Sequence, residues 1–571
     1  MTVLQLMNNW HRAKQISLID VLLTINLAVG WLLPNHYLPW LAFHENAWVA
    51  MSLLLIGLRC IPLIKSYIRI TTSGLTLIAI SVLPWVQHLL GLLPLISDAI
   101  LQSVCLFGAA VAYIIAQQHS RNRSLEVAGY ILVATSIASI ISSGIATYQW
   151  LGMAQDLDLM NIWILPFSES TRPYANMAQP NQLATLLLCG LLGIGWIWNK
   201  RYLPSSIALI ASAWILWGIA LTESRTALLT LSAGIIYLSL VKPKYLEKKE
   251  IISAQILFLI FILFLFQKTA LANFFGQSIP LSLIERSSGE LRIPIWKMSL
   301  EASLHHPWLG YGWGRSNAGY FEVYENYKQI FENIYFEKSH NLILDLILWA
   351  GWPIAIGLTA LGCFWLRRAA RAVDSLDRLL VLMALCAFLA HAMLEFPLHY
   401  GYFLWPFFVL AGSISDHAKS DCEYFIKIPS IYAHGIMLSL VVFVILVTID
   451  YFKVEESFTD LRFQVARVGP QKEKEKINMF ILRDWPDVIA LSKATPHSGM
   501  SEEEINHWEA LLLYNTAPLN LRKVIGAYKL NGKYAEARAW ANRACWLLQE
   551  KACKDLYDEW SLATPIIETV R

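Results

Sequence analysis

Apolar runs of membrane-spanning length recur along the first 450 residues of this 571-residue chain. A helix needs about 20 apolar residues to cross a hydrocarbon core roughly 30 Å thick. Because backbone groups in lipid must be hydrogen-bonded within the protein, these runs predict helices. The 13 predicted spans are residues 16–33, 46–64, 75–95, 98–117, 126–151, 182–198, 205–221, 226–241, 251–271, 341–366, 378–394, 399–414 and 431–450. The sequence therefore predicts an all-α polytopic membrane protein.

The composition agrees with this class. Charged residues make up 15% of the chain and hydrophobic residues 56%, whereas a soluble protein has roughly 25% charged residues. The net charge of +3 is small, and in a membrane protein the distribution of charge matters more than its sum. We expect membrane lipids around the chain and no nucleic-acid partner.

The basic residues alternate from loop to loop. Every loop after an even-numbered span carries at least two Lys or Arg, while the short loops 34–45, 95–97 and 395–400 carry none. By the positive-inside rule, this pattern predicts a cytoplasmic N-terminus. Three regions then lie outside, namely the loops 152–181 and 272–340 and the tail 451–571. We expect a Gram-negative inner-membrane protein with a transmembrane region, 1–450, and a periplasmic C-terminal domain, where nucleotide substrates are absent.

The tail reads as a helical domain. Residues 520–548 carry small and aromatic residues at tetratricopeptide-like spacing. These positions are Tyr528, Gly532, Tyr534, Ala537 and Ala544. Cys545 and Cys553 would face an oxidising compartment, which permits a disulfide without requiring one.

The loop 272–340 ends at a histidine, within Ser339-His340-Asn341, directly before an apolar run. A histidine can accept a proton near neutral pH, and the free N–H groups of a helix start favour anions. His340 is therefore the candidate catalytic base. The alternative is an interfacial polar residue that only caps the helix. Asp345, just over one turn later, could orient a polar group or pair with another span.

Several arginines are predicted at the external ends of spans. Their guanidinium groups suit phosphate, which they bind through two parallel hydrogen bonds, and they could neutralise a diphosphate leaving group. The candidates are Arg172, Arg225, Arg292 and Arg315. Glu223 could instead simply neutralise Arg225.

Two external junctions are rich in amide, carboxylate and aromatic side chains. These groups suit sugar hydroxyls through hydrogen bonds and ring stacking. The candidate positioning residues are Gln179, Asn181, Gln182, Glu395, Tyr400 and Tyr402. The alternatives are a helix cap at the first junction and an interfacial aromatic belt at the second.

Common cofactor and metal motifs are missing from the sequence. It contains no Walker A loop, no GxGxxG on a strand–turn–helix, no HExxH and no acidic metal triad. The spacing of Asp156 and Asp158 is not specific to a metal site, and we interpret them as a solvated pair in a loop. We therefore expect neither a metal nor a cofactor.

Three segments together resemble the bacterial O-antigen ligase and polymerase superfamily. They are TESRTALL (222–229), GELRIPIWKMSLEASLHHPWLGYGWG (289–314) and SHNLILDLILWAGWPIAIG (339–357). Within that superfamily, RPYANMAQPNQLATLL (172–187) and EFPLHYGYFLWP (395–406) are similar to the protein O-oligosaccharyltransferase (PglL-type) branch.

The resemblance implies a GT-C-like fold and a reaction. A preassembled oligosaccharide would pass from undecaprenyl diphosphate to a Ser or Thr of a periplasmic, pilin-like protein, by an inverting transfer without metal or cofactor. His340 matches the family's loop histidine, and Arg225 and Arg292 match its arginines. The functional glutamine and tyrosine match Gln179 and Tyr400, and Gln182 and Tyr402 compete with them.

Other functions share part of this pattern. An O-antigen ligase would use a lipid A core acceptor, and a polymerase would extend the glycan on its own carrier; His340 does not separate these from protein glycosylation. A transporter or flippase would place charged residues at the membrane midplane, whereas here polar residues gather at external span ends. A scaffold built on the tail fits the polarity of the membrane region least well.

Overall fold

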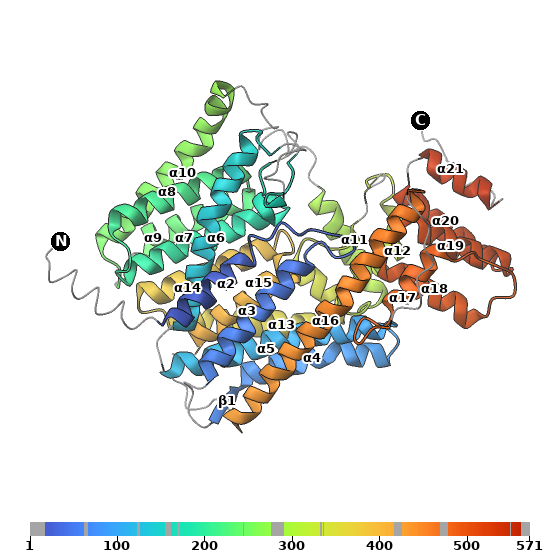
Figure 1. Cartoon of the computed structure of the whole chain (residues 1–571), viewed down its shortest axis with the longest axis horizontal. Coiled ribbons are helices and arrows are strands. Elements are labelled where there is room, and N and C mark those ends of the chain that lie inside the picture. Colours follow the sequence, from blue (N-terminus) through green and yellow to red (C-terminus); the bar gives the residue numbers. More distant parts are fainter. Residues whose placement is uncertain are drawn as a thin grey trace. The chain divides into compact units, whose positions relative to one another are not determined.

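The computed structural model is mostly helical and divides into two compact units. It describes residues 17–61, 67–122, 126–154, 162–167, 172–241, 243, 245–275, 291–331, 334, 336–415, 425–468, 478–548 and 550–560. The first unit, here the N-terminal unit, contains residues 1–80, 105–290 and 361–444. The second, here the loop–tail unit, contains residues 81–104, 291–360 and 445–571. Figure 1 labels the elements, and each unit is described by itself.

A helix occupies each of the predicted apolar runs. These helices are α2 (Leu18–Val29), α3 (Phe43–Cys60), α4 (Thr72–Leu89), α5 (Ile96–Asn122), α6 (Glu126–Trp150), α7 (Pro180–Asn199), α8 (Ser205–Thr222), α9 (Arg225–Val241), α10 (Lys248–Phe274), α13 (Leu342–Arg371), α14 (Leu376–Ala392), α15 (Gly401–Ile414) and α16 (Ser430–Val465). Among the described residues, eight helices are long and apolar enough to cross a membrane, and α2, α9 and α15 are shorter apolar helices. The chain is thus an integral membrane protein with many helical spans, and the number 13 stays a prediction.

The N-terminal unit is built around the close packing of α6 with α7. Ser136 of α6 donates to the Gly190 carbonyl oxygen at 3.0 Å, and Ser139 donates to that of Leu186 at 3.0 Å. A Cβ on Gly193 would come within 2.1 Å of the Leu132 carbonyl oxygen. Small residues let membrane helices approach in this way. The contact holds α7, whose first turn carries several of the predicted site residues.

A two-stranded ribbon is the exception to the all-α prediction. β1 (Tyr67–Thr71) pairs antiparallel with β2 (Phe425–Pro429), with Tyr67 opposite Pro429. In β1, Ile68 and Ile70 are buried while Tyr67 and Arg69 are exposed, the alternation of a half-buried strand. Both segments are short and lie in predicted loops. Their pairing joins residues more than 350 positions apart, which no local pattern reveals.

The loop–tail unit contains α11 (Arg292–His305), α12 (Ser316–Val323) and five tail helices. The tail helices are α17 (Trp485–Lys493), α18 (Glu502–Tyr514), α19 (Pro518–Leu530), α20 (Tyr534–Leu547) and α21 (Glu550–Glu559). Helices α19 and α20 form a hairpin that turns at Gly532, whose φ is 78°. Of the repeat-like positions, Tyr528, Ala537 and Ala544 are buried, whereas Tyr534 is exposed. The tetratricopeptide assignment stays a prediction.

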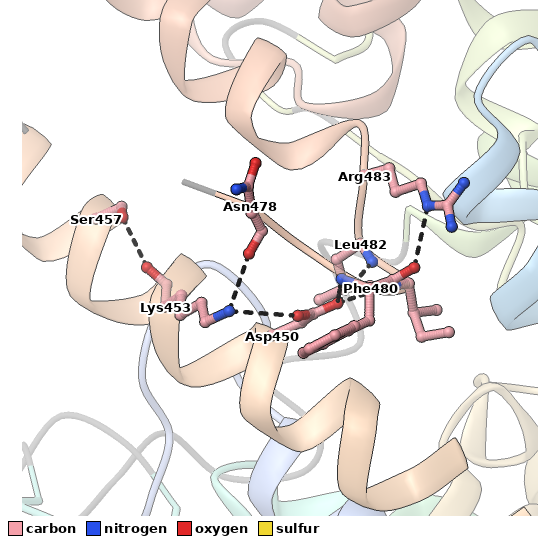
Figure 2. Close-up of polar contacts among 8 residues, drawn as sticks. Asp450, Lys453, Ser457, Asn478, Phe480, Leu482 and Arg483 are labelled. Atoms are coloured by element: carbon pink, nitrogen blue, oxygen red, sulfur yellow. Dashed lines mark hydrogen bonds and ion pairs between the residues drawn. The ribbon is translucent and has the colours of Figure 1, made fainter. Parts of the chain in front are cut away.

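The tail begins on the end of α16. Asp450 is fully buried, and one of its carboxylate oxygens accepts hydrogen bonds from the backbone N–H groups of Phe480, Ile481 and Leu482 at 2.8, 2.6 and 3.1 Å (Figure 2). Lys453 lies 3.9 Å from the same carboxylate and donates to the Asn478 carbonyl oxygen. Because α16 continues from Ser430 to Val465, the predicted domain boundary at residue 450 lies inside this helix. A disulfide joins Cys545 to Cys553 farther along the tail.

Candidate active site

His340 occupies a strained turn at the start of α13. Its φ is 57°, a left-handed conformation that is uncommon for residues other than glycine and that concentrates at functional sites. The next residue, Asn341, caps the helix, because its side-chain oxygen accepts from the backbone N–H groups of Ile343 and Leu344 at 3.0 and 3.3 Å. The half-buried imidazole lies edge-on to the Phe336 ring. Asn341 therefore supplies the side-chain cap of α13, and the role of His340 as a base stays a prediction.

A buried carboxylate holds this turn in place. The Asp345 Oδ1 atom accepts from the Ser339 backbone N–H at 3.0 Å and from the Ser316 hydroxyl at 3.2 Å. Trp349 in turn donates its indole N–H to the Ser316 hydroxyl at 2.8 Å. Ser339, Ser316 and Asp345 are all fully buried. Asp345 therefore orients the backbone just before His340, the first of the two roles considered for it.

A lysine lies beside the same turn. Burial lowers the pKa of the Lys338 ammonium, and the charges of Glu337 and Asp345 oppose that shift. Lys338 is thus a partly desolvated cation next to His340, with two carboxylates close enough to stabilise its charge.

The HPWLGYGWG segment completes a broken helix below the turn. In a regular helix the Trp352 N–H would donate to the Leu348 carbonyl oxygen, but Gly351 has φ 78° and breaks α13 there. Instead, Tyr311 N–H donates to the Leu348 oxygen at 2.7 Å, and Trp352 N–H donates to the Pro307 oxygen at 2.8 Å. One peptide segment is thus inserted into the hydrogen-bond ladder of α13, a recognised cause of helix kinks.

Gln87 satisfies the next open carbonyl. Pro353 has no N–H, so the Trp349 carbonyl oxygen loses its helical donor. The buried Gln87 amide donates to that oxygen at 2.7 Å, and its own oxygen accepts from Trp313 N–H at 2.9 Å. Sequence reasoning missed this residue, although an amide near the end of the predicted span 75–95 is a usable signal.

Two of the predicted arginines lie in the loop–tail unit. Arg292 is the first residue of α11 and is partly exposed. Arg315 donates from Nη1 to the Leu92 carbonyl oxygen at 2.7 Å. Burial lowers the pKa of Arg315, while the charges of Asp98 and Glu509 oppose that shift. Arg315 thus already donates a hydrogen bond to a backbone carbonyl of the protein, and binding of a diphosphate by Arg315 stays a prediction.

The other two arginines lie in the N-terminal unit, near the junction of α8 and α9. Arg172 donates to the carbonyl oxygens of Thr222 and Glu223 at 3.2 and 3.3 Å. Glu223 has φ 47° and forms an ion pair with Lys268 of α10. The residues around Arg225 are buried, whereas Arg225 itself is exposed. The junction therefore presents this guanidinium outward, and the Glu223 carboxylate has a lysine partner.

The segment 172–182 is held by two buried amides. Gln149 accepts from the backbone N–H groups of Tyr174 and Ala175 at 3.1 and 2.7 Å. Asn176 donates to the Leu32 and Trp163 carbonyl oxygens at 2.7 and 2.8 Å. Asn176 is thereby committed to structure. Gln179, at the N-cap of α7, makes no capping side-chain bond and is half-buried.

A buried polar cluster follows at the first turns of α7. Asn181 donates to a Glu395 carboxylate oxygen at 3.0 Å, and the Thr185 hydroxyl is hydrogen-bonded to His391 Nδ1. Gln182 is 1% exposed, and neither of its amide atoms has a partner among the described residues. Thr185 and His391 were not predicted. Spacing is the signal for Thr185, which lies four residues after Asn181 and hence on the same face of α7. Glu395 follows the end of α14, and its backbone N–H donates to the His391 carbonyl oxygen at 2.8 Å.

The two tyrosines differ in access. The Tyr400 and Tyr402 rings are stacked with centroids 5.1 Å apart. Tyr400 is half-buried at the N-cap of α15, whereas Tyr402 is buried, with its backbone bonded to Trp31 and Asn46. Of each competing pair, Tyr400 and Gln179 are therefore the more exposed, and their functional roles stay predictions.

No cluster of three or more metal-ligating side chains occurs among the residues that the structure describes. Asp156 and Asp158 lie outside the described residues.

Comparison with known proteins covers most of the chain. Residues 210–359 match a family model described as O-antigen ligase, residues 379–557 one described as virulence factor membrane-bound polymerase, C-terminal, and residues 173–198 one described as protein glycosylation ligase. A general O-oligosaccharyltransferase of Acinetobacter baylyi is 28% identical over 557 residues, 92% of each chain. A ComP-specific O-oligosaccharyltransferase of the same organism is 30% identical over 47% of this chain and 48% of its own.

Proposed function

Since the chain belongs to the protein O-oligosaccharyltransferases of the O-antigen ligase superfamily, we propose that it transfers a glycan en bloc from undecaprenyl diphosphate to Ser or Thr of periplasmic proteins. Its donor is a lipid-linked oligosaccharide and its acceptor is a protein. The carrier, the acceptor residue and a pilin-like acceptor are the proposed details. The name of the ComP-specific relative supports a dedicated protein acceptor.

The proposed location is the Gram-negative inner membrane, with the active site and the tail in the periplasm. The alternation of basic loops supports this orientation. The disulfide between Cys545 and Cys553 supports an oxidising compartment for the tail.

In the proposed reaction His340 accepts the proton of the acceptor hydroxyl. The hydroxyl oxygen forms a bond to the anomeric carbon, while the bond from that carbon to the diphosphate oxygen breaks with inversion. Undecaprenyl diphosphate leaves, and Arg225 and Arg292 neutralise its growing charge. General-base assistance of this kind contributes roughly 10²- to 10⁴-fold to a rate. No step requires a metal or a cofactor.

Gln179 and Tyr400 are the proposed positioning residues. Both sit at the N-cap of a helix without a capping side-chain bond, and both are half-buried. Their amide and phenol groups are the ones that we expect to bind sugar or phosphate. Asn181, Gln182, Glu395 and Tyr402 support them from buried positions.

The observation that carries the proposed mechanism is the His340 turn, which Asp345 holds in a left-handed conformation. The test co-expresses the chain with a lipid-linked glycan and candidate acceptor proteins, and mass spectrometry identifies modified Ser or Thr. His340→Ala is expected to abolish modification, and His497→Ala, at an exposed histidine of the tail in the same unit, to leave it intact. Glycan found only on lipid A core would indicate a ligase instead.

The diphosphate role of Arg292 has its own test. Arg292→Lys keeps the charge but loses the planar fork that binds two oxygens. We expect a clear loss of glycosylation at normal expression. Full activity of this variant would argue against bidentate binding of the diphosphate.

A further inference from the structure

Helix α11 exposes an apolar stripe where a water-facing helix would be polar. Ile293, Leu300 and Leu304 are 57%, 42% and 68% exposed, and Trp308 beyond the helix end is 75% exposed. Ile293, Lys297, Leu300 and Leu304 follow one another at intervals of three or four, so they lie on one face of α11, and Trp308 follows the end of the helix. Scattered exposed apolar residues are ordinary, but a contiguous apolar face marks an interaction surface.

The other face of α11 packs inside the loop–tail unit. Ile295, Met298, Ser299 and Ala302 are buried. The Ser299 hydroxyl is hydrogen-bonded to the Tyr320 hydroxyl of α12 at 3.0 Å. The helix is therefore anchored on one side, and its orientation toward the surroundings is defined.

We propose that α11 and Trp308 lie in the membrane interface and bury the stripe among the acyl chains of the phospholipid leaflet on the active-site side. An amphipathic helix with leucine and tryptophan on one face and a basic residue beside them binds a bilayer surface in this way. Tryptophan favours the interface because its ring is apolar and its N–H is polar.

The place of Trp308 along α13 supports lipid as the occupant. The segment 307–311 is hydrogen-bonded into α13 at its break near Gly351. Gly351 precedes the basic residue Arg367 by 16 positions, about 24 Å of helix at 1.5 Å per residue. A hydrocarbon core is roughly 30 Å thick. Trp308 therefore lies close to the opposite boundary of that core.

Residues just past the break also face outward. Ile356 is 59% exposed, and a Cβ on Gly357 would meet no atom within 4 Å. The segment of α13 past the break and the stripe of α11 thus both expose apolar residues. This shared exposure favours lipid over a soluble protein as the partner of the stripe.

Polar groups border the stripe. The carboxylate of Glu322 lies 3.5 Å from His305 and 3.4 Å from His306, and it accepts from the Tyr311 hydroxyl at 2.7 Å. Lys297 can extend its ammonium group to lipid phosphates while its stem stays apolar. These contacts set how deeply the helix enters the leaflet.

The anchor gives Arg292 a defined depth. As the first residue of a helix lying in the interface, Arg292 would sit at the level of lipid phosphates, where the diphosphate of a lipid carrier also lies. This consequence rests on the proposed function, whereas membrane insertion of α11 does not.

The test measures lipid contact directly in the full-length protein. A genetically encoded fluorescent amino acid replaces Leu304 or Trp308, and the protein is placed in nanodiscs of phosphatidylcholine with or without brominated acyl chains. Ile356 serves as the lipid-facing control. Tyr534, 62% exposed on the tail, serves as the water-facing control. We expect quenching at 304 and 308 of at least half that at 356, and none at 534. Emission at 304 and 308 that resembles 534 overturns the proposal.

A second measurement tests the link to activity. The pair Leu300→Glu and Leu304→Glu should abolish quenching at 308 and lower glycosylation about tenfold, while Tyr534→Glu should leave both unchanged. Quenching lost without any loss of glycosylation would overturn the role given to Arg292 and leave the anchor standing. Full activity of His340→Ala would refute the proposed mechanism and leave the quenching result untouched.

Discussion

The starts of α7 and α13 use the same backbone device for different purposes. A residue with φ of 57° directly precedes each N-cap, Ala178 before Gln179 and His340 before Asn341. At α13 the strained residue is the proposed base His340, and Asn341 and Asp345 bond to the backbone on either side of it. At α7 the strained residue is an alanine, and the side chains that follow are buried against Glu395 and His391.

The difference indicates a division of roles between the two helix starts. At α13 the left-handed residue His340 has a fixed side-chain direction, because the Asp345 carboxylate holds the backbone of the preceding residue. At α7 the left-handed residue Ala178 precedes the buried polar cluster of Asn181, Thr185, Glu395 and His391. We therefore expect chemistry to depend on α13 and substrate fit to depend on α7.

The largest expected effect is that of His340→Ala. Removing the proposed base should lower transfer to an acceptor by about 10²- to 10⁴-fold, measured as the initial rate of glycosylation with purified donor lipid. Gln179→Ala, the matched change at α7, should lower the rate less and weaken donor binding more. Equal losses of rate at both positions would remove the division of roles.

Asp345→Ala should come next. It leaves the Ser339 N–H and the Ser316 hydroxyl without their buried acceptor, and each such loss costs about 1–3 kcal/mol. Asp345→Asn keeps an oxygen acceptor and should retain most of the stability. Thermal unfolding in detergent measures the difference. Comparable destabilisation by both variants would show that the charge, and not the hydrogen bonds, holds the turn.

Glu395→Gln tests the buried polar cluster at the start of α7. The substitution keeps an acceptor for Asn181 but removes the buried charge, and a hydrogen bond to a charged group contributes about 1.5–3 kcal/mol. We expect a small loss of stability and a raised apparent KM for the donor, with kcat nearly constant. A fall in kcat alone would place Glu395 in the chemical step instead.

The smallest effect concerns pH. His36, in the loop before α3, forms an ion pair with Glu45 at 2.8 Å and contacts the Asn176 carbonyl oxygen at 2.7 Å. Burial lowers the pKa of His36, but the hydrogen bond and charge of Glu45 outweigh it, and the pKa is raised above 6.5. The contribution to stability is therefore complete below pH 6.5 and is lost as the pH rises through the folded-state pKa.

This contribution makes the folded protein more stable at the lower pH. Unfolding temperatures between pH 6 and pH 8.5 should show it for the wild type, and Glu45→Gln should flatten the difference. A wild-type slope that survives this substitution would assign the titration to another group.

Local patterns in the sequence located the helices well. Each apolar run corresponds to a helix, because the need to satisfy backbone groups in lipid acts within one segment. The break at Gly351-Trp352-Pro353 is also legible, since glycine and proline interrupt a helix wherever they occur. Among the candidate residues, His340 at a helix start and Arg225 at a junction were found where the sequence placed them.

Only the tertiary structure showed which distant segments bond to these helices. The pairing of β1 with β2, the amide of Gln87 on the Trp349 carbonyl oxygen and the three N–H groups on Asp450 all join segments that are distant or irregular. Such contacts depend on where a second backbone passes, and a local pattern holds no information about that. The sequence by itself therefore determined the helices and the types of side chain at their ends. The folded chain determined which of these polar side chains bond to another part of the protein, because those bonds depend on which segments lie side by side.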